Sequence, residues 1–316
     1  MNLAIRFDYG KKRFISYGHF FRILKLYNYF KKKYKFSFLI KHGDKKLFKK
    51  YFKADFIRIK KNNHEKINKY LKKNKIKFIL CDINSDCQYL SKNRKSFKLI
   101  GIKDNLINFS YYNIIIFPHP YKIFKKIKNI KFYAGLKYTL LEKNFLKEKH
   151  ILRKRFSNLI ISMGGSDNNN LSKKIINILT KYKFKNNINL VVGPGYKKNL
   201  IKYTNKKIII FKNLSNFEYL QLRLKADLIL TTGGQSMYEN LFLNIPMICF
   251  PTNIHEEKSI KFFNKKKLLI KGSDFKIKNI DFYTKYEFRK KIKRNLYNNI
   301  NYNNNFFNLI QKLLKK

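Results

Sequence analysis

Residues 226–239 read ADLILTTGGQSMYE, and this stretch decides the fold class. A short apolar run ends in two glycines, and a polar segment with helical character follows them. In parallel α/β sheets a buried strand leads through a glycine turn into a helix in this way. Short apolar runs alternate with longer amphipathic stretches through the rest of the chain as well. The sequence therefore predicts an α/β protein built on parallel sheets.

The alternation falls into two series, one on each side of a charged connector at residues 147–150 (KEKH). In the first series the expected strands are Leu3–Phe7, Phe36–Ile40, Phe56–Ile59, Phe78–Cys81, Lys98–Ile102, Ile114–Phe117 and Phe132–Ala134, and the expected helices are His19–Lys32, Lys45–Phe52, His64–Lys73 and Ser85–Leu90. In the second series the expected strands are Leu159–Met163, Leu190–Val192, Ile208–Phe211, Leu228–Leu230 and Met247–Phe250, and the expected helices are Leu171–Thr180, Asn216–Lys225, Ser236–Leu243 and Glu256–Asn264. Residues 286–316 are expected to be helical, with a polar interruption at 298–305.

Two such series predict two Rossmann-like domains that face each other across a cleft. We assign residues 1–147 to the first domain, residues 155–283 to the second, and residues 284–316 to a C-terminal helical segment. Doubly wound sheets bind ligands at the carboxyl ends of their strands. We therefore expect the ligand site in the cleft.

The net charge is strongly positive, at +54, because the chain has 72 Lys and Arg residues and only 18 Asp and Glu residues. Such a balance is typical of proteins that bind nucleic acid or anionic membranes. Most of these cations are lysines spread through every segment, whereas arginine is preferred for bidentate recognition of phosphate and guanine. Lys, Asn, Ile, Phe and Tyr are abundant together, so codon bias is the simpler explanation. We expect no specific nucleic-acid partner, and a polyanion partner is the alternative.

The cysteines are Cys81, Cys87 and Cys249, which form neither an even-numbered disulfide framework nor a zinc-site spacing. Reduced thiols fit a reducing compartment. The N-terminus has no apolar core followed by a cleavage site, and the apolar runs elsewhere are too short to cross a bilayer. We expect a cytoplasmic, monomeric protein without membrane insertion.

A first candidate site lies where the first predicted strand ends and the first helix begins. Asp8 follows the strand, and Gly18 and His19 open the helix that also carries Arg22. The positive end of the helix dipole disfavours a charged imidazole, and a general base at neutral pH must be neutral. His19 is thus a candidate base, and a capping or packing role is an equally good interpretation.

Two glycine pairs mark further strand ends. Gly164 and Gly165 precede a helix that starts near Asn170, and Gly233 and Gly234 precede a helix that carries Glu239. Paired glycines after a buried strand let a phosphate approach the backbone, and a carboxylate beside them can accept both ribose hydroxyls. The alternative for each is structural: an ordinary strand-to-helix turn, or an acid stabilised by the helix dipole.

Together these motifs resemble the PseG/SpsG family, whose first member is the UDP-2,4-diacetamido-2,4,6-trideoxy-β-L-altropyranose hydrolase of pseudaminic acid biosynthesis. The matching patterns are the Arg-x-Asp of residues 6–8, Gly-His-x-x-Arg of 18–22, Gly-Gly-Ser-Asp-x-x-Asn-Leu-Ser of 164–172 and the Gly-Gly…Glu of 233–239. Lesser similarities occur at Asp82, Asp104 and residues 135–138 (GLKY). The resemblance spans residues 3–265 and implies a GT-B type fold.

The resemblance also implies the reaction. Water attacks the anomeric carbon of a UDP-linked amino sugar, UDP leaves with inversion, and neither a metal nor another cofactor takes part. His19 would be the base that activates water, with Asp8 orienting it. The residues implied to contact UDP or the sugar are Gly18, Arg22, Gly164, Gly165, Ser166, Asp167, Asn170, Gly233, Gly234, Ser236 and Glu239.

The sequence departs from the family pattern in three places. Ser16 replaces the first glycine of the usual Gly-x-Gly-His, Glu142 stands where an arginine is frequent, and His255-Glu256 replaces a glutamine. A GT-B glycosyltransferase with a UDP-sugar donor is the alternative function, because one nucleotide site serves both reactions. An inactive member of the family and a nucleic-acid-binding protein are further alternatives.

Overall fold

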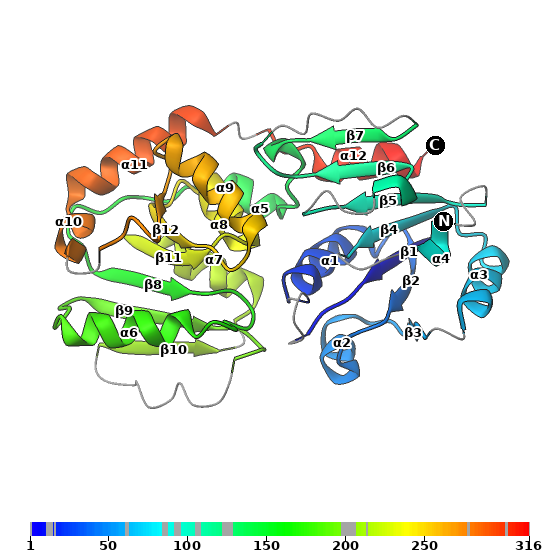
Figure 1. The fold of residues 1–316 in the computed structure, drawn as a ribbon, viewed down its shortest axis with the longest axis horizontal. Helices are drawn as coiled ribbons and strands as arrows, with labels where there is room; N and C mark the ends of the chain where they lie inside the picture. The colour runs from blue at the N-terminus through cyan, green and yellow to red at the C-terminus, as the bar shows by residue number, and fades with distance from the viewer. Residues whose placement is uncertain are drawn as a thin grey trace. The chain divides into compact units, whose positions relative to one another are not determined.

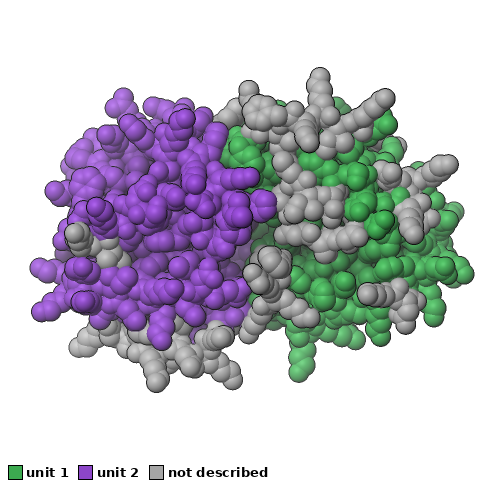
Figure 2. Space-filling view, viewed as in Figure 1, with its two compact units in different colours: residues 1–140, 303–316 green, residues 141–302 purple. Residues whose placement is uncertain are grey.

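The computed structural model describes residues 2–10, 15, 17–60, 63–83, 88–91, 96–104, 109–121, 129–196, 207–212, 214–276, 279–300 and 303–315. The chain forms two compact units, which Figure 2 colours separately. Unit 1 comprises residues 1–140 and 303–316, and unit 2 comprises residues 141–302. The boundary thus lies before the charged connector, and residues 284–316 are divided between the units instead of forming a segment of their own.

Unit 1 is built on a seven-stranded sheet with the order β3-β2-β1-β4-β5-β6-β7 (Figure 1), and every adjacent pair is parallel. The strands are β1 (Asn2–Phe7), β2 (Lys35–Ile40), β3 (Phe56–Arg58), β4 (Phe78–Asp82), β5 (Lys98–Ile102), β6 (Ile114–Phe117) and β7 (Lys131–Ala134). The helices are α1 (Tyr17–Phe30), α2 (Lys45–Tyr51), α3 (His64–Lys73), α4 (Gln88–Ser91) and α12 (Phe306–Leu314), with 3₁₀ turns at Phe109–Tyr111 and Leu136–Tyr138.

Helix α12 completes the core of unit 1 although it is the last helix of the chain. Its residues Phe306, Phe307 and Ile310 belong to the same buried cluster as β1 and α1. The Phe307 ring stacks on Tyr29 of α1 at a centroid distance of 4.0 Å. Burial of such side chains contributes on the order of 1.5–3 kcal/mol each. A segment more than 160 positions away from the rest of its unit in sequence therefore supplies part of its stability.

Unit 2 contains a six-stranded sheet with the order β10-β9-β8-β11-β12-β13, again parallel throughout. The strands are β8 (Asn158–Ser162), β9 (Asn187–Val192), β10 (Ile208–Lys212), β11 (Leu228–Thr232), β12 (Met247–Phe250) and β13 (Ile270–Lys271). The helices are α5 (Lys143–Lys147), α6 (Leu171–Lys181), α7 (Asn216–Leu224), α8 (Gln235–Phe242), α9 (Ile254–Lys265), α10 (Ile280–Thr284) and α11 (Tyr286–Asn299).

All twelve strands expected from the sequence are present, with ends within three residues of the expected ones. The helix expected at Ser85–Leu90 is seen as Gln88–Ser91, and its first expected residues lie outside the described part of the chain. The central strands are buried on both faces, as parallel sheets covered by helices require. For example, β4, β6 and β11 contain only buried residues.

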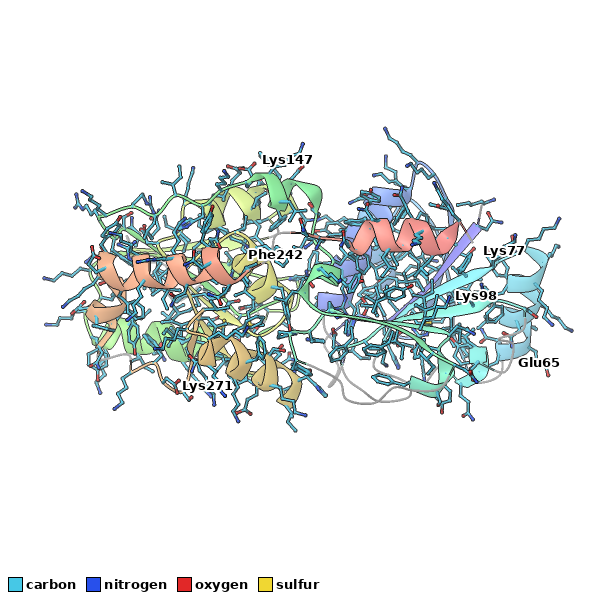
Figure 3. The ribbon with its side chains drawn as sticks, turned by 90° about the horizontal axis from the view of Figure 1, so that it is seen from above. Glu65, Lys77, Lys98, Lys147, Phe242 and Lys271 are labelled. Atoms are coloured by element: carbon cyan, nitrogen blue, oxygen red, sulfur yellow. The ribbon has the colours of Figure 1, made fainter. Side chains whose placement is uncertain are left out.

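The positive charge is distributed over both units. Figure 3 labels Lys77 and Lys98, which are neighbours at the starts of β4 and β5 in unit 1, and Lys147 and Lys271 in unit 2. The first three are exposed, whereas Lys271 pairs with Glu257 at 3.3 Å. None of the helices in the described part of the chain has the length and apolar content that a bilayer crossing needs.

Candidate functional site

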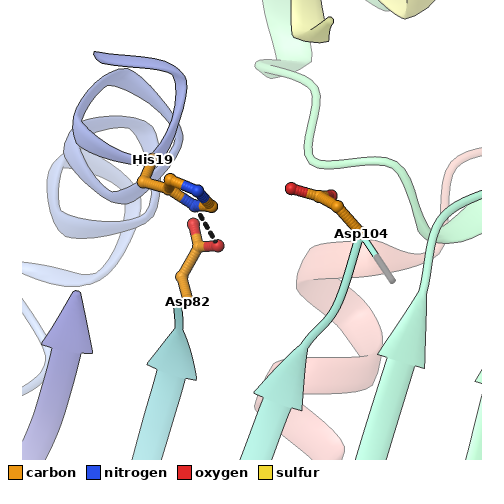
Figure 4. A group of neighbouring side chains, drawn as sticks. All are labelled: His19, Asp82 and Asp104. Atoms are coloured by element: carbon orange, nitrogen blue, oxygen red, sulfur yellow. Dashed lines mark hydrogen bonds and ion pairs between the residues drawn. The ribbon is translucent and has the colours of Figure 1, made fainter. Parts of the chain in front are cut away.

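Polar side chains gather at the carboxyl edge of the unit 1 sheet. Strands β1, β4, β5 and β6 are neighbours and run in the same direction, so their last residues lie along one edge. Asp82 ends β4, Asp104 follows β5, and His119 follows β6. Helix α1 adds His19 and Arg22, which are three positions apart and therefore share one helix face. Figure 4 shows His19, Asp82 and Asp104 at this edge.

His19 is held by Asp82, whose Oδ1 lies 2.7 Å from Nδ1 of the imidazole. Both side chains are almost fully buried. Burial alone would raise the pKa of Asp82, but the charges of Arg22 and His19 and their hydrogen bonds hold it below its ordinary value. An ionised carboxylate can only accept, so Nδ1 must carry the hydrogen. Nε2 of His19 is consequently the basic nitrogen of the neutral ring.

Arg22 bridges the two carboxylates of the cluster. Its Nε donates to Asp82 Oδ2 at 2.7 Å, and Nη1 and Nη2 each donate to an oxygen of Asp104 at 3.0 Å. Nη2 also donates to Asp82 Oδ1. Against the effect of burial, the Arg22 charge and the hydrogen bonds hold the pKa of Asp104 well below its ordinary range. The resemblance implied that Arg22 contacts substrate. In the structure its buried guanidinium donates hydrogen bonds to Asp82 and Asp104.

Asp8 does not orient His19, contrary to the expectation from the sequence. Its two oxygens accept from Arg6 Nη1 and Nη2 at 2.7 and 2.8 Å, and Oδ1 also accepts from the backbone N–H groups of Lys41 and His42. Burial would raise the pKa of Asp8, yet these donors hold it below its ordinary value. Asp8 therefore ties the end of β1 to the end of β2, and Asp82 takes the position beside His19.

The ligand atoms of His19, Asp82 and Asp104 lie within 4.8 Å of one another. Nitrogen and carboxylate oxygen donors of this kind suit divalent cations. The guanidinium of Arg22 already contacts both carboxylates, so a metal ion would have to displace it. The donor types fit a metal, but their arrangement around a fixed positive charge does not.

The loop that contains Gly164 and Gly165 supplies a side chain that caps the helix after it, α6. Gly164 has a φ of +79°, a conformation that favours glycine. The carboxylate of Asp167 then accepts from the N–H groups of Leu171 and Ser172 at 2.8 and 2.9 Å. Asp167 thus occupies the start of α6, where an anion would otherwise bind. Ser166 and Asn170 lie in the same turn, Asn170 in the left-handed region with a φ of +51°.

The second glycine loop has a different helix start. Gly234 precedes α8 and has no side chain with which to cap it. A side chain at Gly233 would come within 2.7 Å of Glu256 Cβ, so only glycine lets α9 pack this closely. Glu256 itself accepts from the N–H and hydroxyl of Thr252. Ser236 lies in the first turn of α8. The N-cap residue Gly234 makes no side-chain cap hydrogen bond, and Oε1 of Glu256 lies 3.6 Å from where a Cβ of Gly234 would be.

Glu239 is buried in α8, with 2% of its surface exposed. Its Oε2 accepts from Arg223 Nη1 at 2.6 Å, and Oε1 lies 3.5 Å from Gln235 Nε2. Arg223 stacks on Tyr219 with 3.7 Å from its guanidinium carbon to the ring centroid. Gly233, Gly234, Ser236 and Glu239 are therefore brought together around β11 and α8, as the sequence motif implied.

Sequence reasoning missed three members of these clusters. Asp82 was recognised only as a lesser similarity, although an acid that ends an apolar strand (78–82, FILCD) is a signal in itself. His119 lies between two prolines after β6, with Nε2 3.5 Å from Asp104 Oδ1. Arg223 had no distinguishing pattern.

Two of the departures from the family pattern can be compared with the structure. Glu142 accepts a hydrogen bond from Asn216 Nδ2 at 2.6 Å, and Ser16 lies outside the described residues.

No protein-family profile matches the sequence. The uncharacterized protein MJ1062 of Methanocaldococcus jannaschii is 35% identical over 144 residues, which cover 42% of this chain and 29% of that protein. The match therefore spans less than a third of the relative.

Solved structures match along the whole chain. MurG of Acinetobacter baumannii has a TM-score of 0.68 at 11% identity, covering 100% of this chain and 99% of its own. The fold is GT-B. The UDP-GlcNAc 2-epimerase of Methanocaldococcus jannaschii, solved with UDP-GlcNAc and UDP, has a TM-score of 0.58 at 16% identity and full coverage of both chains. In this GT-B chain the two parallel sheets carry the two candidate clusters, one at the strand ends of each.

Proposed function

We propose that this protein is a hydrolase that cleaves a UDP-linked diacetamido-trideoxy sugar to UDP and the free sugar. The observation that carries the proposal is the buried His19–Asp82 pair, with Nδ1 of His19 2.7 Å from the carboxylate. The pair keeps the imidazole in one tautomer and leaves Nε2 as the proton acceptor. The GT-B fold and a structural neighbour solved with UDP-GlcNAc support a UDP-sugar as substrate.

The proposed step is a single displacement. Water loses a proton to Nε2 of His19 while its oxygen forms a bond to the anomeric carbon of the sugar. The bond from that carbon to the β-phosphate oxygen breaks, and its electron pair leaves with UDP. Asp82 stabilises the imidazolium that forms, because a carboxylate beside the ring favours its charged state. His19 and Asp82 are thus the proposed base and its partner.

The proposal places UDP on unit 2. Gly234 has no side chain, so the diphosphate can approach the start of α8, where the positive end of the helix dipole stabilises charge on the leaving group. Glu239, beside this loop, is the proposed acceptor for the ribose hydroxyls. In the described conformation its carboxylate binds Arg223, so ribose binding would share Glu239 with that pair.

The test is UDP release from a panel of UDP-amino sugars by the purified protein, with and without candidate acceptor sugars. We expect release without any acceptor. His19→Asn and Asp82→Asn should lower the rate by about 10²–10⁴, the usual contribution of acid–base catalysis, with UDP affinity unchanged in calorimetry. His64→Asn is the matched control, because His64 also lies in the first turn of a unit 1 helix but stacks on Tyr89.

Two results would contradict the proposal. Release of UDP only when an acceptor is present would identify a transferase. A folded His19→Asn protein that releases UDP at the wild-type rate would remove His19 from the mechanism.

A further inference from the structure

We propose that Asp104 recognises the sugar of the substrate, by accepting a hydrogen bond from the amide N–H on carbon 2, the carbon next to the anomeric one. The inference rests on the proposed function, because it concerns the substrate of that same site. It gives Asp104 a contact with the substrate, whereas Asp82 contacts His19 and Arg22. Asp104 is thus proposed to determine which sugars unit 1 accepts.

Asp104 is the accessible member of its cluster. Its side chain is 30% exposed, compared with 8% for His19 and Arg22 and 0% for Asp82. A substrate can therefore reach the carboxylate of Asp104, whereas protein covers that of Asp82.

The carboxylate of Asp104 is ionised and acts as an acceptor. Burial acts to raise its pKa, but the charge of Arg22 and the hydrogen bonds from Arg22 and His119 hold that pKa well below its ordinary range. An ionised carboxylate has about four acceptor positions, and Nη1 and Nη2 of Arg22 take one on each oxygen. The group that Asp104 binds on a substrate must consequently carry an N–H or O–H.

Two residues from other elements fix the direction of this acceptor. The planar guanidinium of Arg22, on α1, donates to both oxygens at 3.0 Å. Nε2 of His119, after β6, lies 3.5 Å from Oδ1. The His119 ring packs on Phe117 with 4.5 Å between centroids, and prolines with restricted φ stand on both sides of it in the chain. An acceptor held in this way loses little conformational freedom when a substrate binds.

The place of Asp104 beside His19 points to carbon 2. Its carboxylate points toward the imidazole (Figure 4), and one of its oxygens lies within 4.8 Å of a ring nitrogen of His19. In the proposed step the water lies between Nε2 and the anomeric carbon, about 3 Å from each. The anomeric carbon is bonded to the leaving oxygen, the ring oxygen and carbon 2, and neither oxygen carries a hydrogen. The donor closest to the reacting carbon is therefore the one on carbon 2.

The experiment compares two substrates that differ in one group. The first is the UDP-linked diacetamido-trideoxy sugar, and the second has an acetyl ester in place of the 2-acetamido group, which keeps the shape but lacks the N–H. UDP release gives kcat/KM for both. Asp104→Ala should lower kcat/KM for the amide by about 10–150-fold, the scale of a hydrogen bond to a charged group, and that for the ester far less. The preference for the amide should therefore fall.

The ratio of the two kcat/KM values separates recognition from structural damage. Any disturbance of Arg22 or His19 affects both substrates alike and cancels in this ratio. Asp82→Asn is the matched control, because Asp82 also accepts from Arg22 but is covered by protein. It should lower kcat/KM for both substrates equally and leave the ratio unchanged.

Asp104→Asn is the second variant, for the case that Asp104→Ala does not fold. The amide keeps the size of the side chain and an oxygen for Arg22, but it is a weaker acceptor because it has no charge. The preference for the 2-acetamido substrate should fall in this variant as well. UDP affinity in calorimetry should stay at the wild-type value in both variants, because UDP lacks the sugar that Asp104 contacts.

The outcomes distinguish this inference from the proposed function. If the wild type releases UDP and the amide-to-ester ratio is the same in the folded Asp104 variants, the inference is wrong and the proposed function stands. A purely structural Asp104 would give this result, with a lower melting temperature and equal losses on both substrates. If the wild type releases UDP from neither substrate, the proposed function fails, and the inference fails with it.

Discussion

His150 gives unit 2 a stability that depends on pH. The ring is buried, and its Nε2 lies 2.7 Å from the carbonyl oxygen of Ala226. Nδ1 lies 3.3 Å from Nζ of Lys293, which also donates to the His150 carbonyl. A neutral ring satisfies both contacts, because Nε2 donates and Nδ1 accepts. Burial, and then the charge of Lys293, lower the pKa of His150 from 6.5 to about 4.

The sign and size of the effect follow from this depressed pKa. Between pH 6.5 and about 4 the unfolded chain binds a proton at His150 more readily than the folded one, so acid favours unfolding. The contribution of His150 is complete above pH 6.5 and is lost as the pH falls to about 4. A difference of about 2.5 pH units at 1.36 kcal/mol per unit corresponds to about 3 kcal/mol.

The assay compares the wild type with His150→Gln, since glutamine can still donate to Ala226 but does not titrate. The two units need not unfold together, so the measurement is hydrogen exchange of amides in β8 and β11, which report on unit 2. Between pH 7.5 and 4.5 the wild type should lose up to about 3 kcal/mol more of its opening free energy than the variant. Carboxylates common to both proteins cancel in this difference. If the opening free energies of the wild type and of His150→Gln changed by the same amount over this pH range, His150 would not be the source of the pH dependence.

Two further predictions concern Glu239 and α12. Glu239→Ala leaves the buried Arg223 without its partner, so the unfolding free energy should fall by about 3–5 kcal/mol, whereas Glu239→Gln should cost less. In calorimetry the folded Gln variant should bind UDP about 1.5–3 kcal/mol more weakly, and an unchanged affinity would remove Glu239 from the nucleotide site. Deleting residues 303–316 uncovers the face of unit 1 that α12 packs on. Limited proteolysis should then cut unit 1 sooner than unit 2, and equal protection of the two would contradict this packing.

The strands could be predicted because parallel strands buried on both faces read as continuous apolar runs. The run 114–117 (IIIF) is an example, and it forms β6 without a change of bounds. Strand β13 was missed because it has only two residues, Ile270 and Lys271, too few for any periodic pattern. It exists because β12 offers an edge with which it can pair.

The site was predictable only in part, for a topological reason. His19 could be found because a glycine and the start of a helix mark it in the sequence. Its partner depends on which strand lies beside α1 at the sheet edge, and β4 is next to β1 although β2 and β3 lie between them in the sequence. In the sequence Asp8 is closer to His19 than Asp82 is. Arg6, however, is two positions from Asp8 on the same side of the chain, and its guanidinium donates to the Asp8 carboxylate.

The pair of Arg223 and Glu239 shows the same limit in unit 2. The two residues belong to different helices, α7 and α8, with β11 between them. No helical or strand periodicity relates positions in separate elements. Only the packing of these helices on one sheet brings the two charges within 2.6 Å.

The return of α12 to unit 1 has a consequence for synthesis of the protein on the ribosome. The strands of unit 1 emerge first, but the helix that covers part of their core emerges only after residues 141–302 have been translated. At usual elongation rates this interval is on the order of ten to thirty seconds. Unit 2 is continuous in sequence and can fold during that time, while unit 1 still exposes apolar surface. Nascent unit 1 should therefore be the part of this protein that chaperones bind, and unit 2 should reach its native state first.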